Sequence, residues 1–173
     1  MPKQFLILTA IGDDRPGLVG ELSATISSHQ GNWLESSMSR LGGKFAGIVK
    51  VDVAAEQVAA LQAELGKLAG LKVTAEVSAA EAAPRGRRLR FSLVGHDRIG
   101  IVREVSQVLA RHAVNVEELT TRTSSAPMSA ETLFHAEAEL LAGPGLDSAA
   151  LARALEAISN DLMVDISLDE TIA

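Results

Sequence analysis

The sequence contains one short motif twice, and this duplication limits the possible folds more than any other feature. GDDRPGLV occupies residues 12–19, and GHDRIGIV occupies residues 95–102. Each motif follows an apolar run and leads into a stretch with helical periodicity. Five residues recur at a constant separation of 83 positions, so we interpret the chain as a tandem duplication. The recurring pairs are Gly12 and Gly95, Asp14 and Asp97, Arg15 and Arg98, Gly17 and Gly100, and Asn32 and Asn115.

A chain of 173 residues has room for two domains of about 80 residues each. Residues 78–88, SAAEAAPRGRR, contain small residues, a proline and a glycine, and they show no hydrophobic periodicity. We therefore predict an N-terminal domain at 1–80, a linker at 81–88 and a C-terminal domain at 89–173.

Hydrophobic periodicity predicts the same order of elements, βαββαβ, in both copies. Gly42–Gly43 is a two-residue hairpin signal, whereas the second hairpin, around 124–130, is longer and contains Pro127. In the first copy the expected strands and helices cover residues 5–11, 17–29, 32–41, 44–53, 58–68 and 71–77. In the second copy they cover residues 89–94, 101–109, 115–123, 132–140, 151–162 and 163–168.

This order predicts an α+β fold made of two ferredoxin-like domains. Each domain is expected to form a four-stranded antiparallel sheet with both helices on one face. In the first strand, residues 5–10 alternate in a way that makes both faces apolar. The open face therefore needs a cover, and we expect another domain or another subunit to supply it. A homo-oligomer formed through the sheets is the expected state.

Composition and charge exclude several classes of protein. The chain has no cysteine, which removes disulfides and thiolate chemistry and fits a reducing cytoplasm. Its formal net charge is −6 and neither half is basic, so we do not expect direct DNA binding through phosphate contacts. No apolar run approaches the roughly 18 residues of a membrane span, and the short run at 5–11 meets two aspartates instead of a cleavage site. We expect a soluble, cytoplasmic protein.

The duplicated motif has a purely structural interpretation. Asp14 stands where a helix N-cap would, and Pro16 near the first helical position would pre-set φ. Arg15 would then pair with a nearby acid. In the second copy Asp97 has the same place as Asp14, and Ile99 replaces the proline.

The same turn also suits a ligand. Unpaired N–H groups at the start of a helix attract an anion such as a carboxylate. Gly17 and Gly100 have no Cβ, so a small molecule can approach the backbone closely. Asn32 and Asn115 begin the following strand, and we expect their amides to lie near the turn. An α-amino acid fits this chemistry, with its ammonium group against loop carbonyls or the aspartates of the motif.

A second signal follows each motif, GNW at residues 31–33 and VNV at residues 114–116. In this combination the motifs resemble the signature turns of ACT domains, βαββαβ modules that often sense amino acids. The resemblance covers nearly the whole chain as two copies. In such domains the ligand lies between the first strand–helix turn of one module and the sheet edge or turn of a partner module. The ligand-binding residues that the resemblance implies are Asp14, Arg15, Pro16, Gly17, Leu18 and Asn32, and Asp97, Arg98, Ile99, Gly100, Ile101 and Asn115.

The resemblance implies a regulator without catalytic residues, cofactor or metal. Its expected ligand is a small amino acid, with glycine as the first candidate. At best about −1.5 kcal/mol per heavy atom is available, so the Kd for glycine has a limit of a few µM and is expected at about tens of µM to mM. The partner that the resemblance implies is a transcriptional activator protein. The acidic charge of the chain agrees with this, since it fits regulation through a protein better than regulation through DNA.

Three other functions remain open. An acylphosphatase-like enzyme has the same topology and uses an arginine and an asparagine, which Arg15 and Asn32 could mimic, but Asp13 and Asp14 would repel a phosphate. An RNA-binding module would need paired aromatic residues on its central strands, and the sequence has four Phe, one Trp and no Tyr. The basic stretch RGRRLR at 85–90 fits a solvated linker.

An ACT pair that binds no ligand and serves only for docking or oligomerisation fits the same motifs.

Overall fold

The computed structural model describes residues 2–79, 85–127 and 131–170. The chain divides into two compact units, Met1–Ala82 and Ala83–Ala173. Each unit contains the elements βαββαβ and a four-stranded antiparallel sheet. The predicted fold class, two ferredoxin-like α+β domains, is therefore confirmed.

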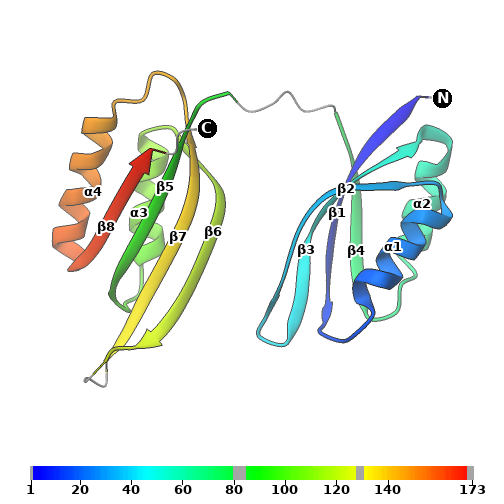
Figure 1. Ribbon diagram of the computed structural model, residues 1–173, viewed down its shortest axis with the longest axis horizontal. Coiled ribbons are helices and arrows are strands. Elements are labelled where there is room, and N and C mark those ends of the chain that lie inside the picture. Colours follow the sequence, from blue (N-terminus) through cyan, green and yellow to red (C-terminus); the bar gives the residue numbers. More distant parts are fainter. Residues whose placement is uncertain (1, 80–84, 128–130, 171–173) are drawn as a thin grey trace. The chain divides into compact units, whose positions relative to one another are not determined.

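The strands of the first unit are β1 (Lys3–Asp13), β2 (Asn32–Leu41), β3 (Lys44–Ala54) and β4 (Leu71–Ser78). Its helices are α1 (Leu18–Ser28) and α2 (Val58–Leu65), with the short 3-10 turn η1 (Ala55–Gln57) before α2. The strands pair antiparallel in the order β2-β3-β1-β4. Both helices lie on one face of this sheet, and among the described residues of the unit no helix lies on the opposite face (Figure 1).

The strands of the second unit are β5 (Arg87–His96), β6 (Val114–Ser125), β7 (Thr132–Ala142) and β8 (Val164–Glu170), and its helices are α3 (Ile101–Arg111) and α4 (Ser148–Leu162). The sheet order β6-β7-β5-β8 repeats that of the first unit. Because β5 begins at Arg87, residues 87 and 88 belong to a strand and not to the predicted linker, whose residues 81–84 lie outside the described part. Within the described residues no helix is both long enough and apolar enough to span a bilayer.

Alternation along β1 builds the first core. Leu6, Leu8 and Ala10 are at most 3% exposed and face the helices. Leu22 and Ile26, four residues apart on α1, pack into the same cluster. Full burial of one such side chain contributes about 1.5–3 kcal/mol. The second unit has its own cluster, which includes Leu89, Phe91, Leu93, Val105, Leu109, Leu140, Leu151 and Leu155.

The hairpins explain why the internal repeat changes its spacing. Gly42 and Gly43 have φ values of 57° and 78°, as the type I′ turn of a two-residue hairpin requires. Leu41 pairs with Lys44 across this turn, whereas the equivalent pair in the second unit is Ser124 and Leu133. The second hairpin is thus six residues longer, and equivalent positions are 83 residues apart before it and 89 residues apart in the strand that follows it.

Both units also have a β-bulge at the same place. The register shifts between Trp33 and Glu35 in β2, and between Val116 and Glu118 in β6. These positions are 83 residues apart, like the motif residues. A shared irregularity of the backbone is independent support for duplication, since side-chain periodicity does not require it.

Candidate functional site at the strand–helix turns

Gly12 and Gly95, which begin the two motifs, are required by close packing. A Cβ on Gly12 would lie 2.1 Å from the carbonyl oxygen of Gly70, just before β4. A Cβ on Gly95 would lie 2.2 Å from Cγ1 of Val164, the first residue of β8. Non-bonded carbon atoms do not approach other heavy atoms so closely. This repeated glycine therefore has a structural role in both units.

Gly17 and Gly100 set the direction in which each first helix starts. Their φ values are 95° and 100°, in the left-handed region that favours glycine. The helices begin at the next residue. The backbone N–H of Glu21 donates to the carbonyl of Gly17 at 2.9 Å, and that of Glu104 donates to the carbonyl of Gly100 at 3.0 Å.

The aspartates of the motif close the turn onto the hairpin instead of capping the helix. The backbone N–H of Asp14 donates to the carbonyl of Gly43 at 3.0 Å, and that of Asp97 donates to the carbonyl of Thr132 at 2.9 Å. The predicted N-cap role of both aspartates is wrong, because a glycine in the left-handed conformation takes the N-cap position. Pro16 lies before that glycine, and so it is outside the helix as well.

Two salt bridges hold the first turn against the β2–β3 hairpin. The Nε of Arg40 donates to Oδ2 of Asp14 at 2.6 Å. The ammonium of Lys44 donates to Oδ1 of Asp13, and this hydrogen bond lowers the pKa of the Asp13 carboxyl. The turn is therefore fixed by side chains as well as by its backbone.

The arginine of the motif pairs with a glutamate in the first turn of the helix. The guanidinium of Arg15 donates to both carboxylate oxygens of Glu21, at 2.6 and 2.8 Å, and to the carbonyl of Ala69 at 3.2 Å. The hydrogen bonds with Arg15 lower the pKa of Glu21, and those with Glu21 raise the pKa of Arg15. In the second unit Nη2 of Arg98 lies 3.3 Å from both oxygens of Glu104. The expected pairing with a nearby acid is confirmed in both copies.

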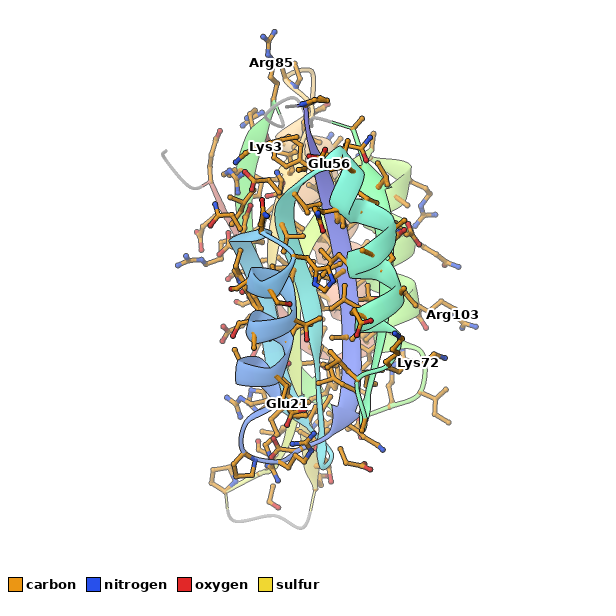
Figure 2. All side chains as sticks on the ribbon, turned by 90° about the vertical axis from the view of Figure 1, so that its right-hand side faces the viewer. Lys3, Glu21, Glu56, Lys72, Arg85 and Arg103 are labelled. Carbon is orange, nitrogen blue, oxygen red and sulfur yellow. The ribbon has the colours of Figure 1, made fainter. Side chains whose placement is uncertain are left out.

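An open pocket of about 160 Å³ lies beside the first turn. Within the described residues no side chain caps α1, so the N–H groups of its first turn keep their capacity to bind an anion. A Cβ on Gly20 would have no atom within 4 Å, which leaves this side of the pocket clear. Figure 2 looks onto α1 and α2 and shows Glu21 at this end of the unit. The lining residues are Asp14, Arg15, Gly17, Leu18, Val19, Gly20 and Phe45.

Asn32 and Asn115 lie far from the turns of their own units. Asn32 pairs with Asp52, which is opposite Phe5 on β1. Phe5 precedes Asp13, at the end of β1, by eight residues, or about 26 Å of extended strand. The expectation that these amides lie near the turn is therefore wrong within a unit. The helix after each turn runs back along the sheet, so the next strand starts at the other end.

The second turn has a different surface. Ile99 is 99% exposed where the first unit has a proline. Arg103 stands where the first unit has a glycine, and its Nη2 lies 3.6 Å from the place of a Cβ on Gly100. The Nδ1 of His96 lies 3.4 Å from a carboxylate oxygen of Glu131. The Arg103 guanidinium thus lies beside the start of α3, whereas the atom nearest to a Cβ on Gly17 is Oε1 of Glu21, at 3.8 Å.

Leu18 and Ile101, the last motif residues predicted to bind ligand, are each 3% exposed. Their side chains belong to the two cores, so mainly their backbone could contact a ligand. Within the described residues no group of three or more His, Asp or Glu side chains could hold a metal ion. The turns therefore offer mainly backbone N–H groups to a ligand, since Asp14, Arg15 and Arg98 already form salt bridges.

Sequence reasoning missed two pairs of residues at these turns. Glu21 and Glu104 recur at the 83-residue spacing and bind the motif arginines. Phe45 lines the pocket at the first turn, and its equivalent is Phe134. Those phenylalanines are 89 residues apart, so only a comparison that allows for the longer second hairpin reveals them.

Comparison with known proteins agrees with this fold. Residues 4–78 match the family model of the ACT domain. The first unit is therefore an ACT domain, and the second unit has the same topology.

Across both units, the chain is similar to the glycine cleavage system transcriptional repressors of Escherichia coli (strain K12) and Shigella flexneri. Each is 22% identical over 171 residues, which cover 96% of this chain and 90% of the relative. A crystal structure of an unknown protein from Galdieria sulphuraria has 30% identity and a TM-score of 0.86, over 99% of this chain and 100% of that one. A crystal structure of a candidate glycine cleavage system transcriptional repressor has 19% identity and a TM-score of 0.71, over the full length of both chains, and so shares the fold.

Proposed function

We propose that this protein is a non-enzymatic, amino-acid-responsive regulator in the cytoplasm, of the kind represented by the glycine cleavage system transcriptional repressor. One observation carries the proposal: α1 starts without a side-chain cap beside an open pocket of about 160 Å³. The similarity to that repressor over 96% of the chain adds support.

The first turn suits a small zwitterion. A carboxylate can accept hydrogen bonds from the free N–H groups of the first helical turn, where the helix dipole also favours an anion. The ammonium group can approach Asp14, whose side chain is 33% exposed even though it holds Arg40. Arg15 is already paired with Glu21, so its role is to shape the turn and not to bind the carboxylate.

The second turn is the weaker candidate for the same ligand. Arg103 lies over Gly100, and Ile99 extends into solvent. Glycine at the first turn is therefore the first ligand to test. Its size limits the Kd to about a few µM at best, and about tens of µM to mM is expected.

Regulation is proposed to pass through a protein, namely a transcriptional activator of the glycine cleavage genes, and not through DNA. The net charge of −6 opposes binding to phosphates. The basic stretch at the start of β5 is largely neutralised, because Arg87, Arg88 and Arg90 each form a salt bridge with a glutamate. This supports a protein partner over a nucleic acid.

A calorimetric titration with glycine, with serine and alanine for comparison, tests the ligand. We expect saturable glycine binding that Gly20→Leu abolishes, because the new side chain fills the pocket. Gly143→Leu is the matched control, since a Cβ on Gly143 also meets no atom within 4 Å but lies in the other unit.

A docking module without a ligand is the second candidate function. The observation in its favour is that most residues of the motif already have a structural task, from the packing of Gly12 to the salt bridge of Arg15. Absence of heat from all three amino acids up to about tens of mM would support this candidate and reject the sensor.

A further inference from the structure

We propose that two copies of the chain pair through the open face of the first sheet, around a two-fold axis that passes over Ile48 and runs across the strands. This inference does not depend on the ligand at the turns. It rests on the residues that β-pairing places in three neighbouring rows of that face.

The middle row defines the axis. Ile48 pairs with Ser37 of β2 on one side and with Thr9 of β1 on the other, and Thr9 pairs with Thr74 of β4. The hydroxyls of Thr9 and Thr74 are hydrogen-bonded to each other. A two-fold axis along this row places each residue of the row opposite the same residue of the second copy. It also places the neighbouring row that contains Ile11 opposite the row that contains Ile7.

Apolar side chains lie in the centre of this face. Ile48 is 54% exposed and Ile11 is 48% exposed, although both belong to central strands. Ile7, two residues before Thr9, is partly buried and lies in the row opposite that of Ile11. The two-fold axis would place Ile11 of one copy over Ile7 of the other, and Ile48 over Ile48. Such a contact covers the apolar surface that an isolated sheet leaves in water.

The charges at the edge of the face are self-complementary about the same axis. On β4, Lys72 is paired with Ile11 and Glu76 with Ile7. The exchange of rows therefore places Lys72 of one copy opposite Glu76 of the other, twice in the dimer. Within the described residues neither side chain forms a salt bridge, so both are available for this contact.

The hollow beside Ile48 fits the same arrangement. It has a volume of about 230 Å³ and is open to the face of the sheet. Ile7 and Ile48 contribute its apolar surface, and Glu35 and Lys50 are the charged residues of its lining. A branched aliphatic side chain from a second copy fills such a depression better than water does.

The second unit supplies an internal comparison. Its position equivalent to Ile48 is Glu137, and those equivalent to Lys72 and Glu76 are Asp165 and Asp169. The same axis on that sheet would place Glu137 against its own copy and aspartate against aspartate. Like charges in contact oppose association. We therefore expect the open face of the first unit to pair with the same face of a second copy. The shared fold alone does not favour this pairing, because the corresponding face of the second unit would repel its own copy.

The test is the molar mass of the full chain, measured by sedimentation equilibrium and by light scattering after size exclusion. We expect a dimer for the native sequence and a monomer for Ile48→Glu. Val94→Glu is the matched control, because Val94 is the second unit's equivalent of Ile11 and is 37% exposed. Far-UV circular dichroism verifies that each variant is folded.

Charge exchange tests the axis itself. Lys72→Glu and Glu76→Lys should each weaken the dimer by about tenfold or more, since each puts like charges together twice. The double variant should recover the dimer, and an equimolar mixture of the two single variants should form a heterodimer. A native chain that is monomeric at about 100 µM, or a dimer that Ile48→Glu and both charge variants leave unchanged, would overturn the proposal.

Discussion

The guanidinium of Arg15 holds both carboxylate oxygens of Glu21, six residues further along the chain, at 2.6 and 2.8 Å. The bond ties the loop before the helix to the first turn of α1. Arg98 and Glu104 repeat it in the second unit at the same spacing. The turn thus keeps its shape without a ligand, which lowers the conformational cost of binding one.

Acid should remove the contribution of this pair to stability. The pKa of Glu21 is lowered in the folded protein, so its contribution is complete above the ordinary glutamate pKa and is lost as the pH falls through the folded value. We expect Glu21→Gln to destabilise the protein at pH 7 and the two stability curves to converge below about pH 4. Urea unfolding followed by Trp33 fluorescence measures this, because Trp33 is the single tryptophan and lies in the first unit.

Glu56→Gln is the control for this pH series. Glu56 is an exposed glutamate of the same unit, and it forms no salt bridge within the described residues. Its curve should follow that of the native protein. A difference between Glu21→Gln and the native protein that persists unchanged at pH 3 would contradict the role given to the pair.

Two glycines three residues apart should respond to alanine with opposite signs. Gly17→Ala should destabilise the first unit by about 1–2 kcal/mol, because φ is 95° there. Gly20→Ala should stabilise it by about 0.5–1 kcal/mol, because Gly20 is helical and its Cβ would meet no atom within 4 Å. Urea midpoints from Trp33 fluorescence separate the two cases. Equal effects would show that the turn does not need its left-handed residue.

Gly12→Ala should be costly for a different reason. The added Cβ would lie 2.1 Å from the carbonyl oxygen of Gly70, and a backbone atom cannot rotate away as a side chain can. We expect a loss of about 1–3 kcal/mol from the forced shift of the backbone. The same Trp33-monitored urea titration measures it. A midpoint like that of the native protein would mean that β4 moves freely relative to β1.

The hairpin should tolerate asparagine and reject valine. Gly42 and Gly43 both have positive φ, at 57° and 78°. Asn-Gly suits a type I′ turn, so Gly42→Asn should change stability by less than about 1 kcal/mol. Gly43→Val should destabilise by about 1–2 kcal/mol, since a β-branched residue strongly disfavours this conformation. Thermal unfolding by circular dichroism compares the two variants.

The order of elements was predictable because it depends on local sequence patterns, and the duplication makes the same patterns appear in both halves of the chain. The two-residue turn at Gly42–Gly43 and the apolar stripe of α1 each need only neighbouring residues to be recognised. The predicted start of α1 was within one residue of the observed start, but its N-cap was assigned to the wrong residue. An aspartate before a helix usually signals an N-cap, and here a left-handed glycine takes that position. Only the φ value of Gly17 distinguishes the two cases.

The candidate site was predictable in part. Asp14, Arg15, Gly17 and Leu18 do line one pocket, as contiguous residues of one turn can. Asn32 was assigned to the same place because it is close in sequence, but the path of α1 carries it to the opposite end of the sheet. The contribution of strand β3 to the pocket depends on pairing between distant segments, which the motif alone does not encode.

The β-bulges near Trp33 and Val116 have a consequence for polymerisation. β2 and β6 are edge strands of 10 and 12 residues, and a regular edge of that length is a template for another strand. Because each chain has two such sheets, pairing through both edge strands could link chains one after another into a fibril. A bulge shifts the hydrogen-bonding pattern and increases the local twist, so neither edge offers its full length to a flat partner. The β-bulge that both copies share therefore also opposes polymerisation through the edge strands.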